Sequence, residues 1–458
     1  SNNTALGSSC LLDNTTGANN TAVGSSALEN NTTGAKNTAV GKSALATLST
    51  GNENVAMGES AMLNATTAYD SVSIGFEAGK AITTGHSNVL VGQQAALTLT
   101  TGSDNVVIGD AAAVAGATGA DKCVIIGQAA CINLPEDELV AVGYNALNAA
   151  TTGATYNTAI GHKALASTTT GTRNVALGWE AGENLTTGNR CTFIGQNVAQ
   201  GVVTGDDNIG IGREATHALT SGNRNTAVGN YALMNATTPN DNTAIGFQAG
   251  KAITTGYANT FVGEDAGLLA TTAHNNVCIG YDAGEAITTG GENTLIGFQA
   301  AYGLTTADHS VVIGAGMNIG NVSNKVAIYN GTVNANFSGS DTAWTFTSDG
   351  RDKTDIIDLD LGLDFINKLQ PRKFKWDFRD EKRAASWGNG LTKAGFIAQE
   401  LQTVLSEANA TYTGIVDETD PDNLTVGQAN FIPMMINAIK ELSAENNALK
   451  ARLDAAGL

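Results

Sequence analysis

Residues 242–258 read NTAIGFQAGKAITTGYA, and residues 276–292 read NVCIGYDAGEAITTGGE. The same pattern, a short apolar segment that ends in Gly, recurs along most of the chain of 458 residues. The spacing is 17 residues, apart from three consecutive intervals of 18, 16 and 18. Self-similarity at a fixed period predicts an architecture of units that stack on their neighbours. The recurring Gly residues, 19 in all, are Gly7, Gly24, Gly41, Gly58, Gly75, Gly92, Gly109, Gly127, Gly143, Gly161, Gly178, Gly195, Gly212, Gly229, Gly246, Gly263, Gly280, Gly297 and Gly314.

The columns of this repeat predict a short strand in every unit. The residue before the Gly is aliphatic or Met in all copies, and the residue two positions earlier is always Thr, Val or Ile. Such alternation with β-branched residues is typical of a strand. Three residues after the Gly, 16 of 19 copies have Ala, which indicates a site too tight for a larger side chain. We therefore predict that residues 1–314 form an elongated β-solenoid or β-roll, with a turn in each coil that could be helical around Ala-Leu.

A polar column accompanies the apolar one. Four residues before the Gly, 14 of 19 copies have Asn, as at Asn20, Asn37 and Asn54. Stacked Asn side chains can satisfy one another's amides and the backbone of the preceding turn. We expect an asparagine ladder that runs along the rod.

Composition excludes several classes of function. Lys and Arg number 24 against 43 Asp and Glu, which gives a formal net charge of −19. Nucleic-acid binding is disfavoured, because neutralising a phosphate backbone needs clustered cations. The sequence has no apolar run of the roughly 18 residues that span a membrane. Since Ser1 is followed at once by the repeat, we expect an upstream attachment region that the sequence does not include.

After Gly314 the pattern changes. Residues 315–347 are expected to form a β-rich neck, with apolar alternation at Val326, Ile328, Phe337, Trp344 and Phe346. From Ser348 ordinary globular patterning predicts a small α+β domain over residues 348–430, with a helix over residues 360–370 and a strand at Phe374, Trp376 and Phe378.

The last segment, residues 431–458, predicts a coiled coil. Its apolar spacing alternates between three and four residues, which places a polar Asn at one a position. About three heptads are too few for a stable isolated helix, so the helix needs partner chains. The predicted seam is Ile432, Met435, Ile439, Leu442, Asn446, Leu449 and Leu453.

Three motifs carry a resemblance to a known family. They are SDGRDK at residues 348–353, LQP at residues 369–371 and GFIAQE at residues 395–400. In this order, ahead of a terminal helix, they resemble the endosialidase-type intramolecular chaperone at the ends of phage tail fibres and tailspikes. The repeat resembles the head repeats of trimeric adhesins and similar arrays in phage tail fibres. The resemblance implies a homotrimer and a chaperone that folds the fibre.

The resemblance also implies a catalytic pair, Ser348 and Lys353, and self-cleavage between Thr347 and Ser348. A Ser hydroxyl becomes nucleophilic when a nearby base takes its proton, and a Lys of lowered pKa can be that base. The alternative is that Ser348 caps a turn while Lys353 is solvated.

Other chemistry is sparse in the sequence. The five Cys and five His are dispersed without metal-ligand spacing, so no metal or cofactor is predicted. Carboxylates at the turn position before the Asn column are interpreted as solvated rather than as a paired glycosidase site. The residue after the Gly is often aromatic and is a candidate sugar-binding surface; packing between coils or between chains is the alternative. These aromatic residues are Phe76, Tyr144, Trp179, Phe247, Tyr281 and Phe298.

The combined hypothesis is a homotrimeric, receptor-binding tail fibre that is part of the virion, assembled in the host cytoplasm and active outside the cell. Its expected partners are its own copies, a host-surface glycan or protein, and an upstream virion protein. Two alternatives are a bacterial trimeric adhesin with the same rod and, less favoured, a glycan-depolymerising tailspike. A turnover enzyme is not predicted.

Overall fold

The computed structural model describes residues 2–116, 118–134, 137–151, 153–329, 334–338, 345–346, 354–375, 392–418 and 424–457. The chain divides into two compact units, Ser1–Thr347 and Ser348–Leu458. Thr347, Ser348 and Lys353, which the sequence singled out for self-cleavage, lie outside the described residues.

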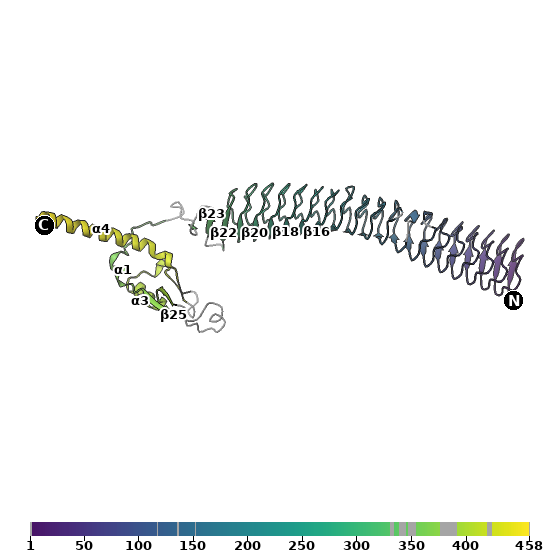
Figure 1. Ribbon diagram of the computed structural model, residues 1–458, viewed down its shortest axis with the longest axis horizontal. Coiled ribbons are helices and arrows are strands. Elements are labelled where there is room, and N and C mark those ends of the chain that lie inside the picture. Colours follow the sequence, from purple (N-terminus) through teal and green to yellow (C-terminus); the bar gives the residue numbers. More distant parts are fainter. Residues whose placement is uncertain are drawn as a thin grey trace. The chain divides into compact units, whose positions relative to one another are not determined.

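The first unit is a parallel β-solenoid (Figure 1), as the repeat predicts. Each strand pairs in register with the strand of the next coil, so Ala244 lies opposite both Ala227 and Phe261. Among the described residues, 19 strands of three residues form this stack. They are β1 (Thr4–Leu6), β2 (Thr21–Val23), β3 (Thr38–Val40), β4 (Val55–Met57), β5 (Val72–Ile74), β6 (Val89–Val91), β7 (Val106–Ile108), β9 (Val124–Ile126), β11 (Val140–Val142), β12 (Thr158–Ile160), β13 (Val175–Leu177), β14 (Thr192–Ile194), β15 (Ile209–Ile211), β16 (Thr226–Val228), β17 (Thr243–Ile245), β18 (Thr260–Val262), β19 (Val277–Ile279), β20 (Thr294–Ile296) and β21 (Val311–Ile313).

The irregular intervals of the repeat leave the sheet undisturbed. β7, β9, β11 and β12 remain paired residue for residue although their spacing changes. The additional residues lie in the turns, where two-residue strands β8 (Ala115–Gly116) and β10 (Asn133–Leu134) pair with each other. Only the turns therefore absorb the change in coil length.

The sheet continues past Gly314 into the predicted neck. β22 (Lys325–Tyr329) pairs in parallel with β21 and antiparallel with β23 (Asn334–Ser338), which also pairs with β24 (Thr345–Phe346). The neck thus begins as one further strand of the solenoid sheet.

Inside each coil the core is narrow. In every strand of the stack after β1, the middle residue is buried, and so is the Ala three residues after the Gly, as at Ala244 and Ala249. The first and third residues of each strand point outward, since successive side chains of a strand lie on opposite faces. The middle residue, which is often Ala, therefore faces the core, and the Thr or aliphatic residues on either side of it face outward.

Where a large side chain enters the core, glycines make room for it. Phe261 is fully buried, and a Cβ on Gly250 or Gly267 would lie 2.8 or 2.6 Å from its ring. Phe193 is buried in the same way beside Gly182, where a Cβ would lie 2.9 Å from its ring. A large core side chain in one coil is thus matched by glycines beside it.

The Gly column marks a close approach of successive coils. At Gly246 φ is +139°, and a Cβ would lie 2.3 Å from the carbonyl oxygen of Gly263. The turn that follows is not helical, contrary to one expectation. Its second and fourth residues after the Gly, such as Lys163 and Leu165, adopt left-handed φ values of 53° and 51°. Alternating left-handed residues prevent the run of right-handed residues that a helix needs.

The predicted asparagine ladder is present. Asn259 Nδ2 donates to Asn242 Oδ1 at 3.0 Å and to the Ala273 carbonyl at 2.7 Å. The Asn259 Oδ1 atom accepts from the backbone N–H and the Nδ2 of Asn276 at 3.1 and 3.0 Å. The Asn259 amide is thus bonded to both neighbouring coils, which removes the cost of burying it.

The second unit is a small α+β structure. Its described residues form the helices α1 (Leu363–Lys368), α3 (Ala398–Glu407) and α4 (Ile432–Ala455), with short 3₁₀ turns η2 (Thr411–Thr413) and η3 (Gln428–Phe431). Two hairpins accompany them, β25 (Arg372–Lys375) with β26 (Thr392–Gly395) and β27 (Val416–Asp417) with β28 (Thr425–Val426). The helix predicted over residues 360–370 is α1, which is shorter at both ends. Within the predicted strand Phe374 lies in β25, while Trp376 and Phe378 fall outside the described residues.

Candidate functional site

The second unit has its own hydrophobic core beneath α4. Phe365 of α1, Leu401 and Leu405 of α3, and Met434 of α4 are buried together. The Phe396 ring stacks on that of Phe431, with 4.9 Å between centroids. The start of α4 is therefore part of a folded unit.

An interaction with α4 fixes the start of α1. The helix has no side-chain cap of its own at Gly362. Instead the Glu441 carboxylate of α4 accepts the Leu363 backbone N–H at 2.6 Å. Asn437 Nδ2 donates to the carbonyls of Leu359 and Leu361 at 3.0 and 3.2 Å. A carboxylate at a helix N-terminus is favourable because it meets free N–H groups and the positive end of the helix dipole.

A bidentate ion pair joins two of the sequence motifs. The guanidinium of Arg372, just after the LQP motif, donates to both carboxylate oxygens of Glu400, the last residue of GFIAQE, at 2.9 Å each. The Glu400 carboxylate raises the pKa of Arg372. Both side chains are about half exposed, so the pair orients the two segments relative to each other more than it stabilises the fold. Sequence reasoning missed Arg372, although its place beside the motif was a signal.

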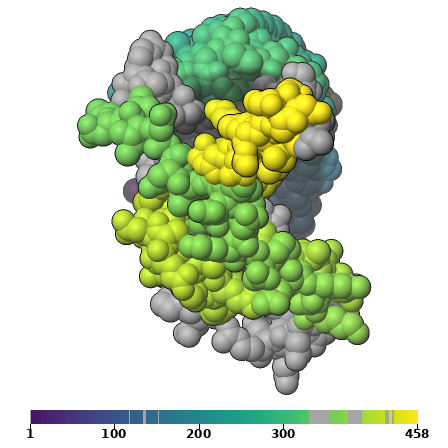
Figure 2. All heavy atoms as spheres, turned by 90° about the vertical axis from the view of Figure 1, so that its left-hand side faces the viewer, coloured from purple at the N-terminus to yellow at the C-terminus, as the bar shows by residue number. Residues whose placement is uncertain are grey.

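The predicted coiled-coil seam is exposed on the single chain. Ile439, the most exposed of its apolar members, has 65% of its surface accessible. Met434 and Ala438, on a different face of α4, are buried, and Met434 belongs to the hydrophobic core of this unit. Figure 2 shows the end of α4, in yellow, on the surface of this unit. The apolar seam has no covering segment among the described residues; its exposed members are Ile432, Met435, Ile439, Leu442, Leu449 and Leu453.

Most of the candidate aromatic surface residues lie in stacks along the rod. Tyr144, His162 and Trp179 follow one another in successive coils, with centroid distances of 5.3 and 4.0 Å. Tyr281 stacks on Phe298 at 5.4 Å, and Phe247 meets the edge of Tyr231. Phe76 is exposed. The stacked rings cover one another's faces, which are the surfaces that a sugar ring would need.

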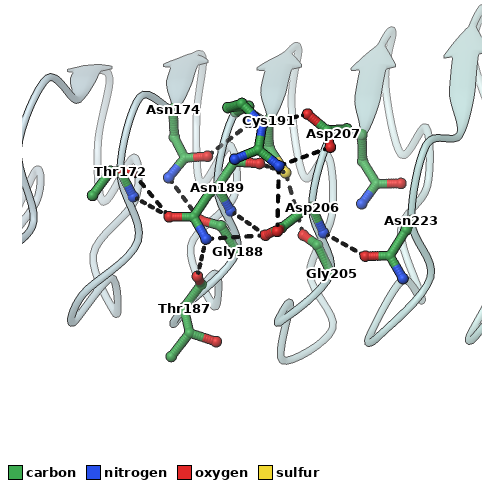
Figure 3. A network of polar contacts seen from close by, with 12 residues as sticks. Thr172, Asn174, Thr187, Gly188, Asn189, Cys191, Gly205, Asp206, Asp207 and Asn223 are labelled. Atoms are coloured by element: carbon green, nitrogen blue, oxygen red, sulfur yellow. Dashed lines mark hydrogen bonds and ion pairs between the residues drawn. The ribbon is translucent and has the colours of Figure 1, made fainter.

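Sequence reasoning missed a second polar ladder, which lies in the turn two residues before the buried Asn column (Figure 3). The backbone N–H of Asn189 donates to Asp206 Oδ1 at 2.8 Å, and that of Asp206 donates to Asn223 Oδ1 at 2.8 Å. Arg190 also binds Asp207 in the next coil at 2.6 Å, and this arginine lowers the pKa of Asp207. This column varies too much in sequence to be recognised, because in other coils it holds Tyr and His side chains whose rings stack on one another.

The cysteines and histidines belong to the rod. Cys123 and Cys191 are buried at ladder positions, and burial raises the pKa of each thiol to about 11. In the part of the chain that the structure describes, no group of three or more His, Cys, Asp or Glu side chains could hold a metal ion. None of the helices described is long and apolar enough to cross a membrane.

A long parallel β-solenoid followed by a small α+β unit is an architecture consistent with a tailspike or tail fibre. The comparison with protein families adds a specific assignment. Residues 348–409 match the family model described as the chaperone of endosialidase. The match contains all three sequence motifs and begins where the second unit begins. No curated protein and no solved structure matches the chain.

Proposed function

We propose that this chain is a bacteriophage tail fibre or tailspike that attaches the virion to a host cell through its rod. A host-surface glycan or protein is the receptor, and an upstream virion protein holds the fibre. The observation that carries the proposal is the chaperone match at residues 348–409 directly after a solenoid unit that ends at residue 347. A chaperone of this family at the C-terminal end of a long repeat fits a fibre whose assembly must be guided.

The fibre is a homotrimer in this proposal, and α4 brings the copies together. The exposed seam from Ile432 to Leu453 would form the core of a three-stranded coiled coil. Burying the seam removes apolar side chains from water, which stabilises association by about 25 cal/mol per Å² of apolar surface. Asn446 at an a position fixes the register at some cost in stability.

Self-cleavage releases the chaperone once the rod has formed. Lys353 accepts the hydroxyl proton of Ser348, and Ser348 Oγ attacks the carbonyl carbon of Thr347. The peptide bond between the two residues breaks, an ester forms, and the amine of Ser348 takes up the proton. Water then hydrolyses the ester, which leaves a Thr347 carboxylate and a free Ser348 hydroxyl.

The test compares the full chain with Ser348→Ala and with the control Ser338→Ala, which lies outside the motifs. On denaturing gels the full chain and the control should give fragments 1–347 and 348–458, and Ser348→Ala should give one uncleaved band. Mass spectrometry should place the new terminus at Ser348. An unchanged fragment pattern in Ser348→Ala would reject the catalytic pair. The labelled fibre should then be retained on bacterial cells and lost after their surface glycans or proteins are removed.

A further inference from the structure

The outer face of the solenoid sheet is a largely apolar surface that no other segment covers among the described residues. It consists of the first and third residues of β1–β7, β9 and β11–β21, here called the strand-face stripe. Every first residue is Thr, Val or Ile, and every third residue is Leu, Val, Met or Ile. No charged residue occurs at these positions, although the chain has 24 basic and 43 acidic residues. The third residues are substantially exposed; Leu177 and Ile245 have 45% and 41% of their surface accessible.

Charge is placed on another part of each coil. The turn before the Asn column contains ion pairs between successive coils, such as Lys36 with Glu53 and Arg224 with Asp241. This column precedes the strand, and the charged positions avoid the strand itself. The stripe is therefore a distinct apolar face, and it does not reflect a generally apolar rod.

The stripe is large enough to be an interface. Nineteen strands at the spacing of roughly 4.8 Å give a length of roughly 90 Å, and three residues give a width of roughly 10 Å. The resulting area of roughly 900 Å² exceeds the apolar patches of a few hundred Å² that monomers usually expose. It is close to the roughly 800 Å² that each partner contributes to a standard interface.

The repeat of the stripe identifies the partner. Its side chains recur once per coil, so a partner stays in contact over the whole length only if its own side chains recur at the same spacing. A second copy of this chain, aligned in the same direction, meets that condition. A globular partner would cover a part of the stripe and leave the remainder in water.

We infer that copies of this chain pack along the strand-face stripe, with the stripes turned towards a common axis. The third-position side chains of one copy lie against the first-position side chains of the next, a head-to-tail contact that closes around the axis. The inference rests on the proposed trimeric fibre and adds the face that its rods share. The aromatic column after the Gly would then border this interface.

Cysteine cross-linking of the full chain tests the face directly. Ile245→Cys lies on the stripe, and Thr238→Cys is its control on an exposed turn of the same coil. Both are made with Cys10→Ser, because the other four cysteines are buried. After treatment with a short bis-maleimide, Ile245→Cys should give a dimer band on denaturing gels and Thr238→Cys should not. Three cysteines around one axis leave one unpaired, so about a third of the chains should stay monomeric.

Native mass spectrometry of the same samples separates the two proposals. A trimeric mass with cross-linking at Thr238→Cys and none at Ile245→Cys would overturn the strand-face stripe and leave the trimer intact. A monomeric mass would overturn both. Ile279→Cys, with the control Thr272→Cys, repeats the test two coils further along, in case a single substitution disturbs folding. Trimers cross-linked at both stripe positions and at neither turn position would establish the interface.

Discussion

The Gly that ends each strand is required for two independent reasons. At Gly246 the backbone has φ +139°, a conformation that residues with a Cβ rarely adopt. A Cβ there would also lie 2.3 Å from the carbonyl oxygen of Gly263. Because that oxygen belongs to the backbone of the next coil, no side-chain rotation can relieve the contact. Strain and stacking thus select the same residue.

Gly246→Ala should therefore destabilise the surrounding coils by at least about 2 kcal/mol, since left-handed strain of about 1–2 kcal/mol is added to the clash. Solenoids open locally, so hydrogen exchange is the suitable measurement. Protection should fall in the strands on either side of Gly246 and remain unchanged near β2. The control is Gly316→Ala, where φ is +66° and a Cβ meets no atom within 4 Å. Equal losses in the two variants would contradict the argument from stacking.

At the scale of one coil, the sequence predicted the period, the strand, the tight Ala site and the asparagine ladder. Each of these depends on one column with a strong residue preference. The left-handed turn was not predicted, because Ser, Glu, Gln, Ala and Leu occupy most of its positions and do not favour that conformation. The Gly at its fourth position in five coils, as at Gly250 and Gly267, was the available signal. The geometry of Ser348 and Lys353 remains a prediction. Its support is the family match, which includes both residues.

Neighbouring coils also place like charges together. Asp265 and Asp282 occupy the same column in successive coils, with Glu264 beside them. Burial and these two acidic neighbours raise the pKa of Asp265, while Lys251 acts in the opposite direction. Among the described residues, Asp265 Oδ1 is buried without a hydrogen-bond partner. The folded chain therefore binds this proton more tightly than the unfolded chain does.

This raised pKa makes the local stability fall as pH increases from the ordinary Asp value through the raised one, so the penalty is greater at pH 7 than at acidic pH. Asp265→Asn removes the charge and keeps a residue that tolerates the left-handed φ of 56°. Hydrogen-exchange protection of β18 and β19 should rise at pH 7. The gain should disappear near about pH 3, where the Asp265 carboxyl group is protonated in both the folded and the unfolded chain. Glu214→Gln, whose stacked neighbours are Asn197 and Tyr231, should give no gain. An equal gain at both pH values would exclude the electrostatic cause.

At the scale of the whole molecule, the register of coils within a chain is specified. The buried Phe261 needs Gly250 and Gly267 beside it, and Arg190 needs Asp207 in the next coil. A shift by one repeat would break these matches, so repeats that look alike in sequence are not interchangeable.

The register between chains is a different problem. The strand-face stripe has nearly the same residues in every coil, so two copies displaced by one coil would bury almost the same apolar area. Area alone cannot distinguish the aligned state from the displaced one. In the proposed trimer, a separate element would therefore have to align the copies before the rods pack. The exposed seam of α4, anchored to its unit through Asn437 and Glu441, is suited to that task.

Placing a charge in the seam should therefore prevent assembly while leaving each coil intact. Ile439→Asp puts a carboxylate at an a position that would be buried between helices, where an unpaired charge costs several kcal/mol. Ala444→Asp adds the same charge at an exposed f position of α4. Light scattering should give a trimeric mass for Ala444→Asp and smaller or misaligned species for Ile439→Asp, and electron microscopy should show rods with staggered ends in the latter. If Ile439→Asp still assembled into aligned trimers, the copies would have to be aligned by the rods themselves, and the role assigned to α4 would be wrong.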